Sequence, residues 1–227
     1  MCARQIKKDR NGSRIRTVAV CLGLALICCP SSGCVSMAAN MLYAIRGNEL
    51  PAEYDGLSEK RVAIICSIEG ASAGEAASTL LSSYISSILT EKLPKAYLVP
   101  TDEVDHRMEI EGWSKSDFGS IGKGLNADQV VMVRVSNLKL RDGATLFRGQ
   151  CNMHVDVYDV KNGSKLVFTK NMADHAFPQH GGVPVTDTTE ANFRNAYLQL
   201  VAAKIAALFH KVDPTQEYAL DATAGRI

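Results

Sequence analysis

The sequence predicts an α/β protein with α+β character: a three-stranded parallel β-α-β-α-β sheet, extended by an antiparallel hairpin meander and closed by a long C-terminal helix. Two observations predict this class. Aliphatic runs alternate with helical periodicity over residues 61–140, an order that favours parallel strands with right-handed crossovers. The following strands are instead flanked by hairpin signals, Asp142-Gly143 and Asn162-Gly163.

The first half contains the parallel part. Arg61–Ile68 is a near-continuous aliphatic run, typical of a strand buried on both faces. Ser72 and Glu75 form a capping box that opens a helix ending at Pro94. Its serine-rich second face is small enough for close packing, but we expect it to be solvated. Four further elements are expected in order. They are a strand at 96–100, a helix from Thr101 or Asp102, a helix over 117–123 and a long strand over 130–140.

The second half changes to the alternating pattern of half-buried antiparallel strands. Polar and apolar residues alternate over 147–157, and 165–172 returns as the next strand. A Gly/Pro loop follows at 177–184. Asp187 and Glu190 then form a second capping box, which predicts a helix running to His210.

Composition limits the class of protein. The chain has 227 residues, of which 46% are apolar and 22% charged, enough for one domain with a sizeable core. The net charge is only +1 and the basic residues are spread along the chain, which disfavours nucleic-acid binding.

The N-terminal segment has the features of an export signal. Residues 1–16 are basic, and 17–29 form an apolar run of about 20 Å as a helix, too short for a hydrocarbon core of roughly 30 Å. Ser31-Ser32-Gly33-Cys34 then resembles the lipobox of bacterial lipoproteins, although Ser31 stands where that family usually has an aliphatic residue. The resemblance implies cleavage between Gly33 and Cys34 and lipidation of Cys34.

The resemblance also bears on domain organisation and location. We expect residues 1–33 to be a signal peptide and residues 34–60 a lipidated tether. Residues 61–213 are expected to form one α/β domain and residues 214–227 a disordered tail. Val35 replaces the aspartate that retains such proteins in the inner membrane, which favours the outer membrane. An ordinary secretory signal or an uncleaved anchor remains an alternative.

Three stretches resemble a group of small envelope lipoproteins: RVAIICSIEG from Arg61, LNADQVVMVRVSNLKL from Leu125, and NFRNAYLQLVAAKIAALFHKVDP from Asn192. The group comprises the curli-secretion-channel lipoprotein, the lipoprotein activators of peptidoglycan synthases and the N-terminal domain of the Tol-system translocation protein. The resemblance implies no catalytic residue set. It implies binding to other envelope proteins or self-association.

One motif favours an enzyme instead. Gly70-Ala71-Ser72-Ala73-Gly74 matches the G-x-S-x-G nucleophile elbow between a strand and a helix, with Asp174 and His175 or His210 as partners. Only one strand precedes it, and no oxyanion segment is visible. Because Ser72 already serves as a helix N-cap, the hydrolase remains the less favoured hypothesis.

The remaining polar candidates also have simpler interpretations. Asp174, His175 and His180 share a loop edge without metal-site geometry, so no metal is expected. His154 and Asp156 are expected on a solvated strand face. The remaining cysteines of the domain, Cys66 and Cys151, are expected to be buried free thiols.

The sequence thus predicts a membrane-anchored lipoprotein of the cell envelope, held through Cys34, with a non-catalytic interaction or assembly module on the periplasmic side. Its partners are the membrane and either another envelope protein or a second copy. No cofactor, metal, nucleic acid or small-molecule ligand is predicted. The alternatives are a serine hydrolase using Ser72 and a domain that binds a small molecule or glycan at the 177–184 loop.

Overall fold

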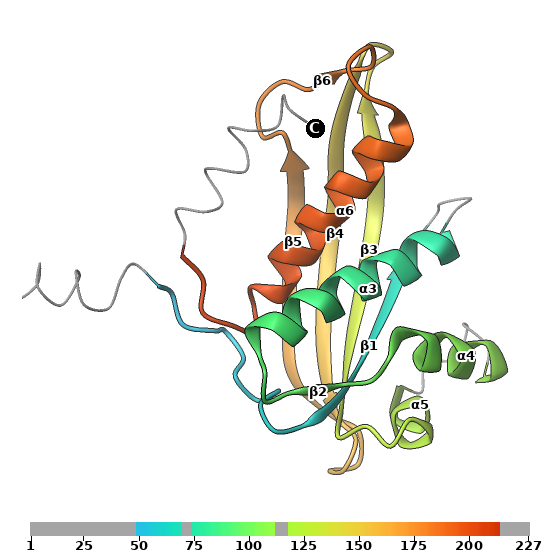
Figure 1. Ribbon diagram of the computed structural model, residues 1–227, viewed down its shortest axis with the longest axis vertical. Helices are drawn as coiled ribbons and strands as arrows, with labels where there is room; N and C mark the ends of the chain where they lie inside the picture. Colours follow the sequence, from blue (N-terminus) through green and yellow to red (C-terminus); the bar gives the residue numbers. More distant parts are fainter. Residues whose placement is uncertain (1–48, 70–73, 112–117, 214–227) are drawn as a thin grey trace, which may run out of the picture. The chain divides into compact units, whose positions relative to one another are not determined.

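The computed structural model describes residues 49–69, 74–111 and 118–213. They form a mixed six-stranded sheet of order β2-β1-β3-β4-β5, with β6 paired to β4, and four helices (Figure 1). The bounds are β1 Arg61–Ile68, α3 Gly74–Lys92, β2 Tyr97–Leu98, α4 Thr101–Glu111, α5 Phe118–Gly124, β3 Gln129–Asp142, β4 Leu146–Asp159, β5 Lys165–Phe177, β6 Val183–Pro184 and α6 Glu190–Ala206.

The parallel part of the sheet lies at β2, β1 and β3. β1 pairs parallel to β3 from Val62 opposite Gln129 to Ile68 opposite Val135, and parallel to β2 on its other side. The expected parallel strands are therefore present. The second is shorter than predicted, two residues instead of the range 96–100, because Pro100 and the start of α4 at Thr101 end the extended backbone.

The antiparallel part extends the sheet by two long strands, as predicted. β4 pairs antiparallel with β3 and with β5, and β5 continues to Phe177 instead of ending near 172. The predicted two-residue hairpin turns are wrong: the connections span 143–145 and 160–164, although Gly143 and Gly163 both have the positive φ of turn glycines. The predicted 177–184 loop ends in β6, which pairs with β4 at Phe147.

The larger core lies between one face of the sheet and the helices α3 and α6, which cross that face together (Figure 1). β1 and β3 contribute aliphatic side chains, and β4 contributes Val155 and Val157. From the helices come the apolar positions expected from helical spacing. They include Leu81, Ile85, Leu89, Phe193, Tyr197, Val201 and Ile205.

A smaller core lies on the opposite face, where α4 and α5 cover the beginnings of β1 and β3. Ala63, Ile65, Val130 and Met132 alternate with the residues of the larger core. α4 contributes Val104 and Met108, and α5 contributes Ile121. We refer to this side of the sheet as the outer face.

The serine-rich face of α3 is only partly solvated. Ser78 and Ser82 are buried, and the backbone N–H of Ile68 donates to Ser78 Oγ at 3.1 Å. The small side chains let α3 approach β1 closely, and the hydroxyl satisfies a main-chain donor at the end of that strand. The expectation of a solvated face holds for Ser83, Ser87 and Thr90, which are exposed.

The end of the predicted tether packs on the domain. Leu57 is buried in the larger core, and the Tyr54 hydroxyl accepts a hydrogen bond from Gln129 Nε2 at 2.9 Å. Leu50 and Val212 exchange two main-chain hydrogen bonds, of 2.8 and 3.0 Å. Residues 49–60 therefore belong to the folded unit, whereas the remainder of 34–60 lies outside the described residues.

The N-terminus of α6 is capped by Thr189, so the predicted capping box at Asp187 is wrong. Thr189 has extended backbone angles, and its Oγ1 accepts the N–H of Asn192 at 3.2 Å. Asp187 instead accepts a hydrogen bond from Thr186 Oγ1. The two positions differ by half a helical turn, a shift that the S/T/D-x-x-E pattern does not resolve.

Thr189→Ala is expected to lower the free energy of unfolding by about 1 kcal/mol, because the N–H of Asn192 loses its acceptor. Urea unfolding of the purified protein measures the change. Asp187→Ala is the matched control and should change stability by only a few tenths of a kcal/mol. A larger effect of Asp187→Ala would contradict this assignment of the cap.

Candidate functional site

The outer face becomes polar beyond the smaller core. After Met132 the next outer-face residue of β3 is Arg134, which lies opposite His154 of β4, and Met132 itself lies opposite Asp156. The Asp156 side chain is only 5% exposed, and its carboxylate accepts hydrogen bonds from Arg134 and from His154 Nε2 (3.1 Å). A buried carboxylate on a sheet face requires such partners, and Arg134 provides the compensating charge.

The sequence-based interpretation of this pair is therefore wrong for Asp156. Its alternating position predicted a solvated face, and His154 is indeed half-exposed, but Asp156 is covered by its neighbours. A usable signal is present in β3, where Arg134 interrupts the run VVMVRV. A charge within a valine-rich strand needs a partner on an adjacent strand.

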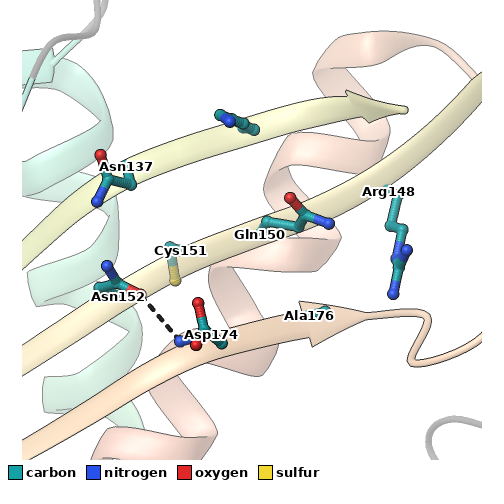
Figure 2. A pocket seen from close by; sticks show the side chains of 8 residues that line it. Asn137, Arg148, Gln150, Cys151, Asn152, Asp174 and Ala176 are labelled. Atoms are coloured by element: carbon teal, nitrogen blue, oxygen red, sulfur yellow. Dashed lines mark hydrogen bonds between the residues drawn. The ribbon is translucent and has the colours of Figure 1, made fainter. Parts of the chain in front are cut away.

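Further along the same face, a pocket of about 400 Å³ lies over the distal parts of β3, β4 and β5 (Figure 2). Polar side chains from the three strands dominate its lining. The lining residues are Asn137, Lys139, Arg148, Gln150, Cys151, Asn152, Asp174 and Ala176. The pocket combines two cations, three amides and one carboxylate, a set suited to hydrogen bonding of a polar ligand.

Bulges in both strands that flank β4 form this pocket. The β3–β4 register shifts between Ser136 and Lys139, and the β4–β5 register shifts between Cys151 and Met153. Each bulge contains a non-glycine residue in the left-handed region, Asn137 at φ 55° and Asp174 at φ 54°. Such bulges redirect side chains and are common beside functional sites.

Arg148 is fixed at one end of the pocket. Its Nε donates to the carbonyl oxygen of Pro178 at 3.3 Å and its Nη2 to that of Gln179 at 2.9 Å, and Asp142 lies 3.6 Å from Nη1. Asn152 is fixed as well, because its Oδ1 accepts the N–H of Asp174 at 2.9 Å. The pocket therefore has a rigid frame before any ligand arrives.

A buried hydroxyl network supports the pocket from the helix side. The Tyr197 hydroxyl donates to the carbonyl oxygen of His175 at 2.9 Å and lies 3.3 Å from both Cys151 Sγ and His175 Nδ1. Burial raises the pKa of Tyr197 and of Cys151, so both stay protonated near neutral pH. The network links α6 to β4 and β5 without a charge.

The structure separates most of the residues that the sequence grouped into sites. Asp174 lines the pocket, His175 contacts Tyr197, His180 is exposed in the following loop, and His210 Nδ1 lies 2.7 Å from the carbonyl oxygen of Lys211. Within the described ranges no three His, Cys, Asp or Glu side chains gather as a metal site. Gly33, Cys34 and Ser72 lie outside the described residues.

The prediction of buried free thiols is confirmed for Cys66 and Cys151, each of which is 2% exposed and unpaired. Burial between β1 and α3 raises the pKa of Cys66 to about 12, which a hydrogen bond with Ser82 offsets only in part. Because the thiolate is the nucleophile, both residues are protected chemically as well as sterically.

Cys66 and Cys151 are expected to remain unalkylated by iodoacetamide in the native protein at about pH 8, where a thiol of pKa about 12 is ionised to roughly one part in ten thousand. Peptide mass spectrometry after timed labelling measures each position separately. The same protein in guanidinium chloride is the control and should be labelled at both. Equal rates in the two conditions would contradict the expectation.

The outer edge of β5 is the other accessible feature. This strand pairs with β4 on one side, and no strand within the described ranges pairs with its other side. Leu166 and Val167 are 46% and 40% exposed near its start. Long unpaired edges with exposed apolar side chains are sites of strand pairing with other chains.

Among the helices that the structure describes, none is both long and apolar enough to cross a membrane.

The sequence matches no protein-family model, and no curated protein is significantly similar to it. One similar solved structure is lipoprotein GNA1162 from Neisseria meningitidis, with 10% sequence identity, a TM-score of 0.41 and coverage of 64% of this chain and 97% of that one. Another is a PelC dodecamer from Paraburkholderia phytofirmans, with 12% identity, a TM-score of 0.40 and coverage of 70% of this chain and 93% of that one. The C-terminal domain of LpoB from Salmonella enterica is similar at 10% identity over 51% and 82%, with a TM-score of 0.36. Lipoproteins of the group that the sequence resembles are thus among the similar structures.

Proposed function

We propose that this chain is a lipid-anchored protein of the cell envelope whose domain is a non-catalytic protein-interaction module. Cys34, freed by cleavage after Gly33, carries the lipid, and two or three acyl chains hold the domain at the periplasmic face of a membrane. The outer membrane is the favoured one, because Val35 follows the cysteine. The lipobox supports the anchor, and the edge of β5 supports the interaction.

The single observation that carries the interaction function is the unpaired outer edge of β5. An extended segment of a partner adds to such an edge through main-chain hydrogen bonds, with alternate side chains setting specificity. Leu166 and Val167 provide apolar contacts, and Lys165 is exposed beside them at the start of the same strand, whereas Lys170 already pairs with Glu53 at 2.7 Å. The proposed partner is an extended apolar segment of another envelope protein with an acidic residue near one end.

Site-specific photo-crosslinking tests this interaction in cells that make the full chain. A benzoylphenylalanine at position 167 is expected to crosslink to one envelope protein, with the crosslinked peptide in an extended apolar segment. Position 90, exposed on α3, is the matched control and should give no such product. Leu166→Asp should remove the product at 167, because a charge is then placed against an apolar segment.

Three results of that experiment are informative in different ways. The same crosslinked peptides from positions 90 and 167, or no product from 167, would refute the role of β5. A product between two copies of this chain would refute a separate partner and assign the edge to self-association. A serine-reactive probe that labels the protein, with labelling lost in Ser72→Ala, would refute the non-catalytic part of the proposal.

The anchor is tested by the intact mass of the mature protein and by membrane fractionation. We expect residues 1–33 to be absent and acyl chains to be present. Cys34→Ser should leave the signal segment uncleaved and the protein without acyl chains, whereas Cys29→Ser should be processed normally. An unchanged mass and unchanged fractionation of Cys34→Ser would refute lipidation at this position.

A further inference from the structure

Three polar side chains in the pocket on the outer face have no partner among the residues that the structure describes. Asn137, Lys139 and Gln150 make no hydrogen bond or ion pair with any other described residue, yet all three line the same hollow. Asn137 lies at the bulge of β3, and Gln150 lies opposite Lys139 across the β3–β4 pair. They are therefore close together and available to a ligand.

The rest of the pocket is fixed. Arg148 is held by two carbonyl oxygens of the loop that follows β5, and Asn152 is held by the main chain at Asp174. Asn137 of β3 and Asp174 of β5 both have left-handed backbone angles within a bulge, and the two bulges lie on either side of β4 at the pocket. A site built in advance in this way loses little conformational freedom on binding.

The chemistry of these groups defines a ligand class. The lining has two cations, Lys139 and Arg148, and one carboxylate, Asp174, and Asp142 beside the pocket lies 3.6 Å from Arg148 Nη1. Because Asp142 compensates part of the charge of Arg148, Lys139 is the main cation offered to a ligand, which favours isolated carboxylates over a group of dense charge. Asn137 and Gln150 each offer a donor and an acceptor, which matches hydroxyl and amide groups. We propose that this pocket binds an acidic saccharide, with a carboxylate at Lys139 and Arg148 and ring hydroxyls at Asn137, Gln150 and Asp174.

Other ligand classes fit less well. The lining contains no aromatic residue and only one aliphatic side chain, that of Ala176, so an apolar molecule gains little by entering. With Lys139, Arg148 and Asp174 the lining has a net charge of +1, which a single carboxylate balances and a phosphate dianion exceeds. A protein strand would use the edge of β5, whereas the pocket opens on the outer face, so this site is distinct from the proposed interaction edge.

Isothermal titration calorimetry tests the proposal on the mature protein, purified from membranes in detergent. The probe is tetragalacturonate, and galactotetraose of the same length is its neutral control. We expect tetragalacturonate to bind at least about tenfold more tightly, since a hydrogen-bonded charge pair at Lys139 is absent with the neutral sugar. Inorganic phosphate, added as a competitor, is expected not to displace the saccharide.

Substitutions locate the binding site. Lys139→Ala and Gln150→Ala should each weaken binding of tetragalacturonate by about tenfold, and Lys139→Arg should retain it. Lys123→Ala removes another exposed lysine, at the end of α5 and outside both proposed sites, and should leave affinity unchanged. Circular dichroism and unfolding of each variant separate a loss of binding from a loss of folding.

The results that overturn the proposal are equally specific. Equal affinity for the acidic and neutral sugars, or full affinity in both Lys139→Ala and Gln150→Ala, excludes an acidic-saccharide site here. Displacement by phosphate at similar concentration reduces the site to a general anion site. Crosslinking from position 167 in Lys139→Ala should be unchanged, so failure of this proposal and failure of the β5 edge are distinguishable.

Discussion

Gly149→Ala is expected to lower the free energy of unfolding by about 3 kcal/mol, the upper part of the range for overpacking a close-packed core. A Cβ at this position of β4 would lie 2.3 Å from Cδ2 and 2.5 Å from Cε2 of Tyr197. The ring has no room to move, because Tyr197 is fully buried and stacks on Phe193 at a centroid distance of 6.5 Å. Urea unfolding monitored by circular dichroism measures the effect.

Two further variants separate packing from backbone strain. Gly163→Ala is the control, since a Cβ there meets nothing within 4 Å and only the positive φ of 75° opposes it; about 1 kcal/mol is expected. In Gly149→Ala/Tyr197→Leu the clashing ring is absent, so the double variant should be less destabilised than the sum of the single ones. Additive effects would show that Gly149 does not act through Tyr197.

Arg134→Met is expected to cost about 2 kcal/mol, because it leaves the carboxylate of Asp156, whose side chain is 5% exposed, without its guanidinium partner. The cost falls below that of a fully buried pair since the Arg134 side chain is 39% exposed and water screens it. The same unfolding measurement applies. His154 remains beside Asp156 at 3.1 Å and retains part of the compensation.

Arg141→Met is the matched control for this prediction. Arg141 pairs with Glu190 at 2.8 Å, but both side chains are about half-exposed, so a loss within about 1 kcal/mol is expected, including its contact with the Phe147 ring. Arg134→Met/Asp156→Leu removes both charges and should be closer to the parent than Arg134→Met. If Arg134→Met costs no more than Arg141→Met, Asp156 does not depend on Arg134.

Periodicity predicted the elements whose burial follows one pattern throughout. The aliphatic run of β1 and the helical spacing of Leu81, Ile85 and Leu89 each determine a structure without reference to distant residues. Periodicity does not determine element boundaries, because Asp187 and Thr189 are both good N-caps and only packing of α6 decides between them. Cys66 and Cys151 were predictable as buried because they lie within apolar strand faces.

The outer-face features were not predictable from alternation alone. Alternation assigns Asp156 to a face but does not say that Arg134 covers it from the next strand. The pocket depends on two bulges, and each reverses the alternation. In β3, Val133, Val135 and then Leu138 face the larger core, so the inward-facing positions change from odd to even residue numbers at Asn137. Asparagine tolerates left-handed backbone angles. That reversal is the signal in the sequence by which the β3 bulge is recognisable.

The main-chain exchange between Leu50 and Val212 makes the domain a nearly closed loop of chain. The first and last described residues of the domain are already adjacent, so a short Gly/Ser segment could join 49 to 213 without moving either end. New ends opened within 143–145 would lie in the exposed connection between β3 and β4. A circularly permuted domain of this order keeps every strand neighbour. The free ends would then emerge beside β6, far along β3 and β4 from the original pair, so a reporter or surface tether attached there would hold the domain in the reverse orientation.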